Sequence, residues 1–161
     1  MITIVLTQDV RLHLASHFQK DMPGSKFYSK SPEDLLEEAI RLFPEKFREA
    51  KPDEDGRIRI SLIFPREIGI SNVVSIDDLT KEEIERIKVV SRNGKNVRSV
   101  ETDRIIPTRE CQFIFSSNWQ LITMFPGEFA PPLPASPNIH DEYWDNHVFT
   151  ELRESSFIAY D

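Results

Sequence analysis

The sequence has little cysteine and no long apolar run, and each shortage excludes a class of protein. Cys111 is the one cysteine among 161 residues, so an intrachain disulfide framework and an all-cysteine zinc site are excluded. No apolar run approaches the roughly 18 residues of a membrane span, and the first residues lack the basic flank and apolar core of a signal peptide. We therefore expect a cytoplasmic protein that does not contact a membrane.

Glycine is scarce as well, with five residues scattered at expected turns. The chain has no glycine-rich phosphate loop, no serine-hydrolase elbow and no HExxH metalloprotease motif, and nothing in it indicates a cofactor. Hydrophobic residues make up 39% and charged residues 29% of the chain, which is ordinary for a globular protein. At roughly 150 residues per domain, we expect a single domain over 1–161.

Basic residues are nearly absent from the last third of the chain. Residues 113–161 contain one basic residue, Arg153, against seven acidic ones, and they carry almost all of the net charge of −7. Residues 86–109 have the opposite bias, with seven basic side chains against two acidic ones. We therefore expect the surface to divide into a positive region over 86–109 and a negative region over 140–161.

The basic stretch offers candidates for nucleic-acid contacts, because arginine presents a planar fork and lysine a point charge to phosphate. The alternative is that these charges only solvate an edge strand and protect it against aggregation. The four candidate nucleic-acid contacts are Arg92, Lys95, Arg98 and Arg109.

The spacing of apolar residues predicts an α+β fold, with helices early and an antiparallel meander late. A period of four over residues 9–20 predicts a helix, although the same residues also alternate, which leaves an edge strand open. Ser31-Pro32 and Pro44 are typical of the start and the end of a helix, predicted over 32–43. We expect one antiparallel sheet with that helix on one face. Its strands are residues 57–64, 68–75, 96–100, 111–116 and 119–125.

Prolines dominate the segment that follows the last of these strands. Five of them lie between residues 126 and 138, which predicts an extended loop. Residues 141–149 are amphipathic and predict a short C-terminal helix. We expect the proline-rich loop and acidic tail over 126–161 to dock on the domain, or to bind a protein partner as a preorganised extended segment.

Two histidines near the start, His13 and His17, would share one face of a helix. Their spacing suits two metal ligands, or a general base with a helper. A third ligand would have to come from the tail, and histidines on a solvated face also need no role. The residues considered for that third ligand are His140, Asp141, Glu142 and His147.

Cys111 precedes two phenylalanines on one strand face, Phe113 and Phe115. A nucleophilic thiol needs a nearby base and an electropositive setting, and the sequence indicates neither. We interpret Cys111 as a small buried hydrophobe.

Two stretches support a family comparison: residues 66–74 (REIGISNVV) and residues 119–127 (WQLITMFPG). A final strand with an I-T-x-F/Y-P pattern, after early helices and an antiparallel meander, resembles the barnase/EndoU/colicin/RelE-like superfamily of small ribonucleases. Many of these are bacterial or phage-borne toxins. The resemblance implies RNA bound in the concave face of the sheet, and metal-independent attack of a ribose 2′-hydroxyl on the adjacent phosphate.

That reaction needs a base, an acid and positive charge at the phosphate. The resemblance implies Arg66 as the group that stabilises charge and Thr123 as the hydroxyl that positions the phosphate. His17 is our candidate for the base, on chemistry alone. Toxins of this kind are usually basic whereas this chain is acidic. The alternative is therefore a non-enzymatic interaction module of the antitoxin, immunity or inhibitor type, which would bind a cognate protein partner through its acidic segment.

Overall fold

The protein has an α+β fold, as the sequence predicts. The computed structural model describes residues 3–18, 25–29, 31–92, 94–102 and 106–152. Within those ranges the chain forms four α-helices, a 3-10 helix and ten strands, and the strands belong to three separate sheets.

The first sheet contains the pattern that the sequence shows most clearly. It is antiparallel, in the order β2-β8-β9. Along β2, every second residue is buried, as expected for a strand with one face on a core. Its strands are β2 (Ile58–Ile63), β8 (Glu110–Phe115) and β9 (Leu121–Pro126).

Three helices cover the buried face of this sheet: α1 (Gln8–Phe18), α2 (Pro32–Leu42) and α3 (Pro44–Glu49). Val10 and Leu14 of α1 are buried whereas Leu12 is 69% exposed, so the helical period is confirmed and the edge strand is wrong. Pro44 ends α2 and begins α3, because proline fits only the first turn of a helix. In α3, the ring of Phe47 packs against the rings of the first sheet.

The second sheet has the order β4-β10-β6-β5 and its own small core. The short helix α4 (Lys81–Glu85) begins with a capping box formed by Thr80 and Glu83. Strands β5 and β6 pair as an antiparallel hairpin, and Asn93 between them lies outside the described residues. The strands are β4 (Val73–Ser75), β5 (Lys88–Arg92), β6 (Lys95–Thr102) and β10 (His147–Leu152), and a 3-10 helix over Ile76–Asp78 follows β4.

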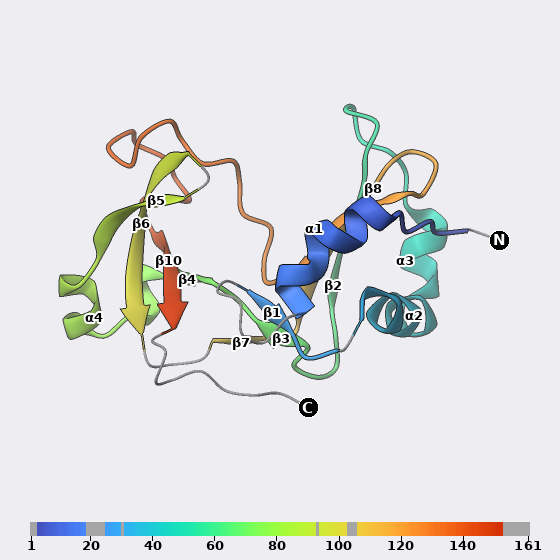
Figure 1. Ribbon diagram of the computed structural model, residues 1–161, viewed down its shortest axis with the longest axis horizontal. Coiled ribbons are helices and arrows are strands. Elements are labelled where there is room, and N and C mark those ends of the chain that lie inside the picture. Colours follow the sequence, from blue (N-terminus) through green and yellow to red (C-terminus); the bar gives the residue numbers. More distant parts are fainter. Residues whose placement is uncertain (1–2, 19–24, 30, 93, 103–105, 153–161) are drawn as a thin grey trace.

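A third sheet of two-residue strands joins the other two. Its strands are β1 (Lys26–Phe27), β3 (Gly69–Ile70) and β7 (Pro107–Thr108), in the order β1-β3-β7. Figure 1 shows it between α1–α3 with β2 and β8 on one side and the second sheet with α4 on the other. The protein is therefore built in two halves that meet at these short strands.

The expectation of a single sheet is wrong: residues 96–100 lie in β6 of the second sheet, and the strand expected over 68–75 divides into β3 and β4. The chain turns at Ser71, whose Oγ accepts a hydrogen bond from the Val73 N–H at 3.2 Å. Just before the turn, β3 passes close to β1: a Cβ on Gly69 would lie 2.2 Å from the carbonyl oxygen of Lys26. Alternation in the sequence indicates which side chains are buried, but it does not indicate which sheet buries them. In this segment β3 belongs to one sheet and β4 to another.

The predicted C-terminal helix over 141–149 is also wrong. Residues 142–146 form turns, and the Asp141 side chain accepts hydrogen bonds from the N–H groups of Tyr143 and Trp144. The chain then enters β10, which pairs antiparallel with β4 and parallel with β6. Pairing on both sides of β10 outweighs the weak local preference for a helix. The sheet is therefore mixed and not a pure meander.

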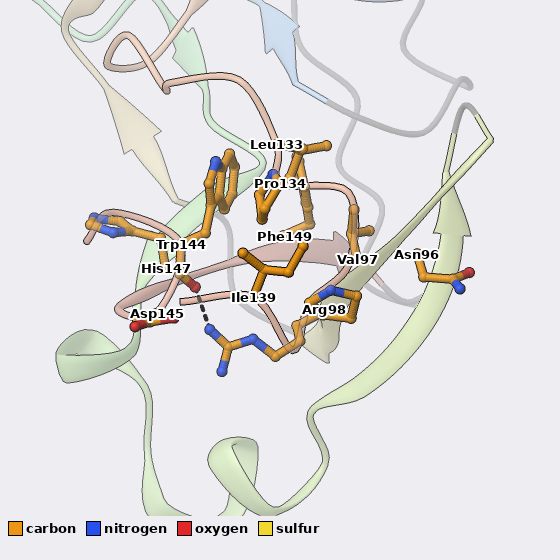
Figure 2. Close-up of a pocket in the computed structure, with 11 residues that line it drawn as sticks. Asn96, Val97, Arg98, Leu133, Pro134, Ile139, Trp144, Asp145, His147 and Phe149 are labelled. Atoms are coloured by element: carbon orange, nitrogen blue, oxygen red, sulfur yellow. Dashed lines mark hydrogen bonds between the residues drawn. The ribbon is translucent and has the colours of Figure 1, made fainter. Parts of the chain in front are cut away.

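The proline-rich loop contains no helix or strand over residues 127–140 and lies over the second sheet. Leu133, Pro134 and Ile139 pack against side chains of β6 and β10 around a cavity of about 20 Å³ (Figure 2). A cavity of that size has room for about one water molecule, so this contact is packing and not a ligand site. Residues 153–161 of the acidic tail lie outside the described residues.

Candidate functional site

Helix α1 runs along the free edge of β9. The alignment begins at Val5, which pairs in parallel with Gln120 through two backbone hydrogen bonds of 3.1 and 2.9 Å. Four residues of helix and two residues of strand each advance the chain by roughly 6–7 Å. Residues four apart on one face of α1 therefore lie opposite residues two apart on one face of β9.

His13 and Thr123 meet at this seam. The Nε2 atom of His13 lies 3.2 Å from the Oγ1 atom of Thr123. Thr123 pairs with Ile114 of β8, whereas the neighbouring pair, Phe113 and Met124, points into the core. The threonine hydroxyl therefore faces away from the core, on the open side of the sheet. The spacing in the sequence groups His13 with His17, but the site implied by the resemblance joins Thr123 to His17 and not to His13.

His17 lies one turn further along α1 and is held by Ser25. Its Nδ1 atom is 2.9 Å from the Ser25 carbonyl oxygen and 3.1 Å from the Ser25 hydroxyl. A carbonyl oxygen only accepts, so Nδ1 carries the proton of the neutral ring and Nε2 is left with the lone pair. Burial lowers the pKa of His17 from 6.5, against the raising effect of the Ser25 carbonyl, and positive charge on Lys26 and His13 lowers it further. The ring is therefore a neutral base at physiological pH.

A cleft of about 360 Å³ opens at the end of this seam, where the two halves of the protein meet. Its size is within the usual range for small-molecule sites. Apolar walls come from β9, the proline-rich loop and β10. The polar side chains that line it are His17, Ser25, Ser71, Asn72 and Glu128. Of these five, sequence reasoning selected only His17.

Arg66 is not part of this arrangement. Its guanidinium forms an ion pair with Glu38 of α2 at 2.5 Å and donates a hydrogen bond to the Glu67 carbonyl oxygen. Helix α2 covers the buried face of the first sheet, whereas Thr123 lies on the opposite face. Of the three catalytic residues selected from the sequence, the structure brings His17 and Thr123 to one seam and places Arg66 elsewhere.

The basic hairpin β5–β6 is packed against the C-terminal segment. The guanidinium of Arg98 donates a hydrogen bond to the Trp144 carbonyl oxygen (Figure 2), and that of Arg92 lies 4.5 Å from the centre of the Phe149 ring. Lys95 donates to the Leu133 carbonyl oxygen at 3.1 Å. The basic hairpin is therefore in contact with the proline-rich loop and with the start of the acidic region, and the expected division of the surface stays a prediction.

Arg109, the fourth candidate for nucleic-acid contact, is exposed and lies outside the hairpin. It donates a hydrogen bond of 3.4 Å to the Pro65 carbonyl oxygen. The four basic side chains thus form no common patch around the cleft. Each has a partner within the chain, and the partners of the three hairpin residues come from the segment that runs from the proline-rich loop into β10.

The metal site considered for His13 and His17 would need a third ligand from the tail, and the structure does not bring one to them. In the tail, His140 forms an ion pair with Asp145, and the His147 ring stacks on Tyr143 with 3.8 Å between ring centres. Among the described residues, no group of three or more histidine, cysteine or acidic side chains is arranged to hold a metal ion.

Cys111 is fully buried in the first core, as interpreted from the sequence. Burial, with the nearby Glu110 charge, raises the pKa of its thiol well above the ordinary value, so the sulfur is a packing group. Over the described ranges, no helix is long and apolar enough to span a membrane. Comparisons of the chain with family models, curated proteins and solved structures gave no significant match.

Proposed function

We propose that the chain is a metal-independent endoribonuclease whose active site lies at the seam of α1 and β9. The observation that carries the proposal is the 3.2 Å contact between the His13 ring and the Thr123 hydroxyl. It joins an early histidine to the last-strand hydroxyl that the resemblance implies. His17 lies on the same helix face, so two imidazoles and a hydroxyl line one edge of the sheet. Cytoplasmic RNA is the proposed substrate.

His17 acts as the general base. Its Nδ1 proton is bound by the Ser25 carbonyl oxygen, which leaves Nε2 to take the proton of the ribose 2′-hydroxyl. The lowered pKa of the ring keeps this atom unprotonated at neutral pH. As the 2′-oxygen bonds to phosphorus, the bond from phosphorus to the 5′-oxygen of the next nucleotide breaks. The products are a 2′,3′-cyclic phosphate and a 5′-hydroxyl.

His13 supplies the proton that the leaving 5′-oxygen takes up. Positive charge on His13 lowers the pKa of His17, so a proton on His13 disfavours a second proton on His17. Acid–base catalysis requires one group that gives a proton and one that takes it, and in this proposal they are His13 and His17. Thr123 donates a hydrogen bond to a phosphate oxygen and fixes the phosphate between the two rings.

Positive charge near the phosphate comes from Lys26 of β1 in place of Arg66. Lys26 is 3% exposed and lies close enough to His17 to lower its pKa. A buried ammonium acts through a poorly screened field. It therefore stabilises negative charge that develops at the phosphate without touching it.

The test is cleavage of a labelled single-stranded RNA in excess chelator, with the product ends identified. We expect cleavage that persists in chelator and leaves cyclic phosphate, and no cleavage of an RNA that lacks 2′-hydroxyls. His17→Asn keeps a donor for the Ser25 carbonyl and should lower the rate by about 10²–10⁴-fold. His140→Asn is the matched control, because His140 does not line the cleft, and it should leave the rate unchanged. Chelator-sensitive cleavage, or full activity of His17→Asn, would overturn the proposal.

The second candidate is a non-enzymatic interaction module with a cognate protein partner. The observation in its favour is that Arg66, Arg92 and Arg98 all have partners inside the chain, so these cations are not free to hold a polyanion. A well-folded protein that cleaves no RNA in the assay above would support this candidate.

A further inference from the structure

We infer that the cleft at the end of the α1–β9 seam is a subsite for one unpaired adenine base of single-stranded RNA, held by Asn72 and stacked on Phe125. The inference rests on the proposed ribonuclease function, because it names the substrate of that site. The inference is based on a comparison of the side chains that line the cleft. Some of them already make hydrogen bonds or ring contacts inside the protein, whereas others do not.

Three of the polar groups in the cleft have partners within the chain. The Ser25 hydroxyl is bonded to His17, the Ser71 hydroxyl donates to the Val73 carbonyl oxygen at 3.2 Å, and the Glu128 carboxylate accepts from the Tyr143 hydroxyl at 2.7 Å. These bonds shape the cleft, and a ligand would have to compete with them.

Asn72 is different, because its carboxamide makes no hydrogen bond to any residue that the structure describes. Its backbone is nevertheless fixed, since its carbonyl oxygen accepts from the Thr150 N–H at 2.8 Å and the neighbouring Val73 pairs with Phe149. The amide is thus held on a rigid support with one donor and one acceptor site available. An asparagine amide matches adenine, which offers the N6 amino donor and the N7 acceptor side by side.

The aromatic walls show the same contrast. Phe149 has Arg92 over its ring and Trp144 stacked on it at 5.1 Å between ring centres. Its ring therefore already has stacking partners inside the protein. Phe125 makes no ring contact with another described aromatic side chain, and it is half-buried at the cleft. Unpaired RNA bases commonly stack on aromatic rings of this kind.

The charge of the cleft favours a base over a phosphate. No lysine or arginine of the described chain lines it, whereas Glu128 does. A phosphate in the cleft would meet this carboxylate, whose described partners are the Tyr143 hydroxyl and the His147 ring. A neutral base avoids this repulsion.

The spacing of residues along β9 places the adenine subsite next to the proposed catalytic residues. Phe125 and Thr123 lie on the same face two residues apart, a distance of about 7 Å. A base stacked on Phe125 leaves its own ribose and phosphate beside Thr123 and the two histidines. Cleavage should therefore follow adenine.

Binding is measured without cleavage, by titrating the intact protein with adenosine, guanosine, cytidine and uridine monophosphates and with short RNAs methylated at the 2′-oxygen. We expect adenine to bind at least about fivefold more tightly than the other bases, the lower end of the contribution of one bidentate pair. NMR contacts between adenine protons and the Phe125 ring would locate the base directly, without any variant.

Two pairs of substitutions complete the test. Asn72→Asp keeps the shape but loses the donor to N7 and should abolish the preference for adenine, whereas Asn138→Asp in the proline-rich loop should keep it. Phe125→Leu should weaken binding at least about fivefold, whereas Phe129→Leu should not. Melting curves establish that each variant is folded, and Asn72→Ser replaces Asn72→Asp if the latter is not.

The outcomes separate this inference from the proposed function. Equal affinity for all four bases, no nucleotide binding, or an unchanged preference in a folded Asn72 variant would overturn the adenine subsite, even if RNA is cleaved. Adenine binding with the expected Asn72 and Phe125 effects but no RNA cleavage would overturn the nuclease and leave the subsite standing as a binding site.

Discussion

The His13 imidazole and the Thr123 hydroxyl, 110 residues apart in the sequence, are 3.2 Å apart in the fold. The contact depends on α1 being fixed along β9 by the Val5 backbone at one end and by the burial of Val10 and Leu14 along its length. Both side chains remain accessible on the open side of the sheet. Substitutions at this seam should therefore affect activity with little effect on stability.

Thr123→Val should remove activity without unfolding the protein. Valine keeps the β-branched shape, and a partly exposed position of this kind usually changes stability by no more than about 0.5 kcal/mol. Loss of one hydrogen-bond donor to the reacting phosphate should slow cleavage by about a hundredfold. Thr123→Ser restores a hydroxyl and should recover most of the rate. Equal rates for the valine and serine variants would exclude a role for the hydroxyl.

Arg66→Ala should leave cleavage within about twofold of the original rate, which differs from the role that the resemblance implied. The guanidinium is bound to Glu38, on the other side of the sheet from Thr123. Such surface ion pairs contribute at most about 1 kcal/mol, so the melting temperature should fall by no more than about 4 °C. Glu38→Gln should give a similar small shift. A hundredfold loss of activity in Arg66→Ala would return Arg66 to the active site.

Stability should fall as the pH drops below about 6.5, and His17 should contribute to that fall. Burial lowers the pKa of His17 in the folded protein below its unfolded value of 6.5. Between these two pKa values the unfolded chain binds more protons, so protonation favours unfolding. The stabilising contribution of the neutral ring is present above 6.5 and is lost as the pH falls through the folded pKa. Denaturant unfolding of the original protein and of His17→Asn between pH 5 and 7 should show a flatter dependence in the variant.

His13→Asn should raise the pKa of His17. Positive charge on His13 is one of the causes that lower it, and asparagine removes that charge while keeping a polar side chain near Thr123. The direction follows because a neighbouring cation disfavours protonation. An NMR titration of the His17 ring would measure the shift, and His140→Asn should leave the same titration unchanged. A lower or constant pKa would show that the two rings are not coupled.

Gly69→Ala should destabilise the junction between the two halves of the protein. The added Cβ would lie 2.2 Å from the backbone carbonyl oxygen of Lys26, and a backbone atom cannot move aside as a side chain can. Overpacking of this kind costs about 1–3 kcal/mol or more. Because Lys26 follows Ser25, the partner of His17, activity should fall as well. Chemical denaturation measures the loss, and an alanine tolerated without cost would mean that β1 and β3 are not so closely paired.

Features encoded locally could be predicted from the sequence. The alternation of Ile58, Ile60 and Leu62 is enough to identify β2, and the Thr80–Glu83 capping box identifies the start of α4. Pro44 marks the end of α2 because its ring is incompatible with a continuing helix. In each case the physical cause lies within a few residues of the effect.

Features that depend on distant partners could not be predicted. Residues 147–152 lack a strong strand pattern, and β10 exists because β4 and β6 pair with it on both sides. The same holds for the candidate site. Ser25 lies in no motif and Asn72 has no assigned role in the 66–74 stretch, and only the meeting of α1, β9 and the β3–β4 turn places them at one cleft. The four-residue spacing of His13 and His17 was the available signal, and it indicated a shared face without indicating what lies opposite.

The position of β10 between β4 and β6 also sets an order of assembly during synthesis. The first core needs no residue beyond β9, so it can form while the rest of the chain is still being made. Strands β4 and β6, by contrast, emerge with facing edges that no earlier segment fills, and such open edges are templates for pairing with other chains. Until residues 147–152 leave the ribosome and insert between them, the nascent protein has a vulnerable period. A chaperone that shields strand edges, or slow translation ahead of β10, should therefore alter its yield more than its final stability.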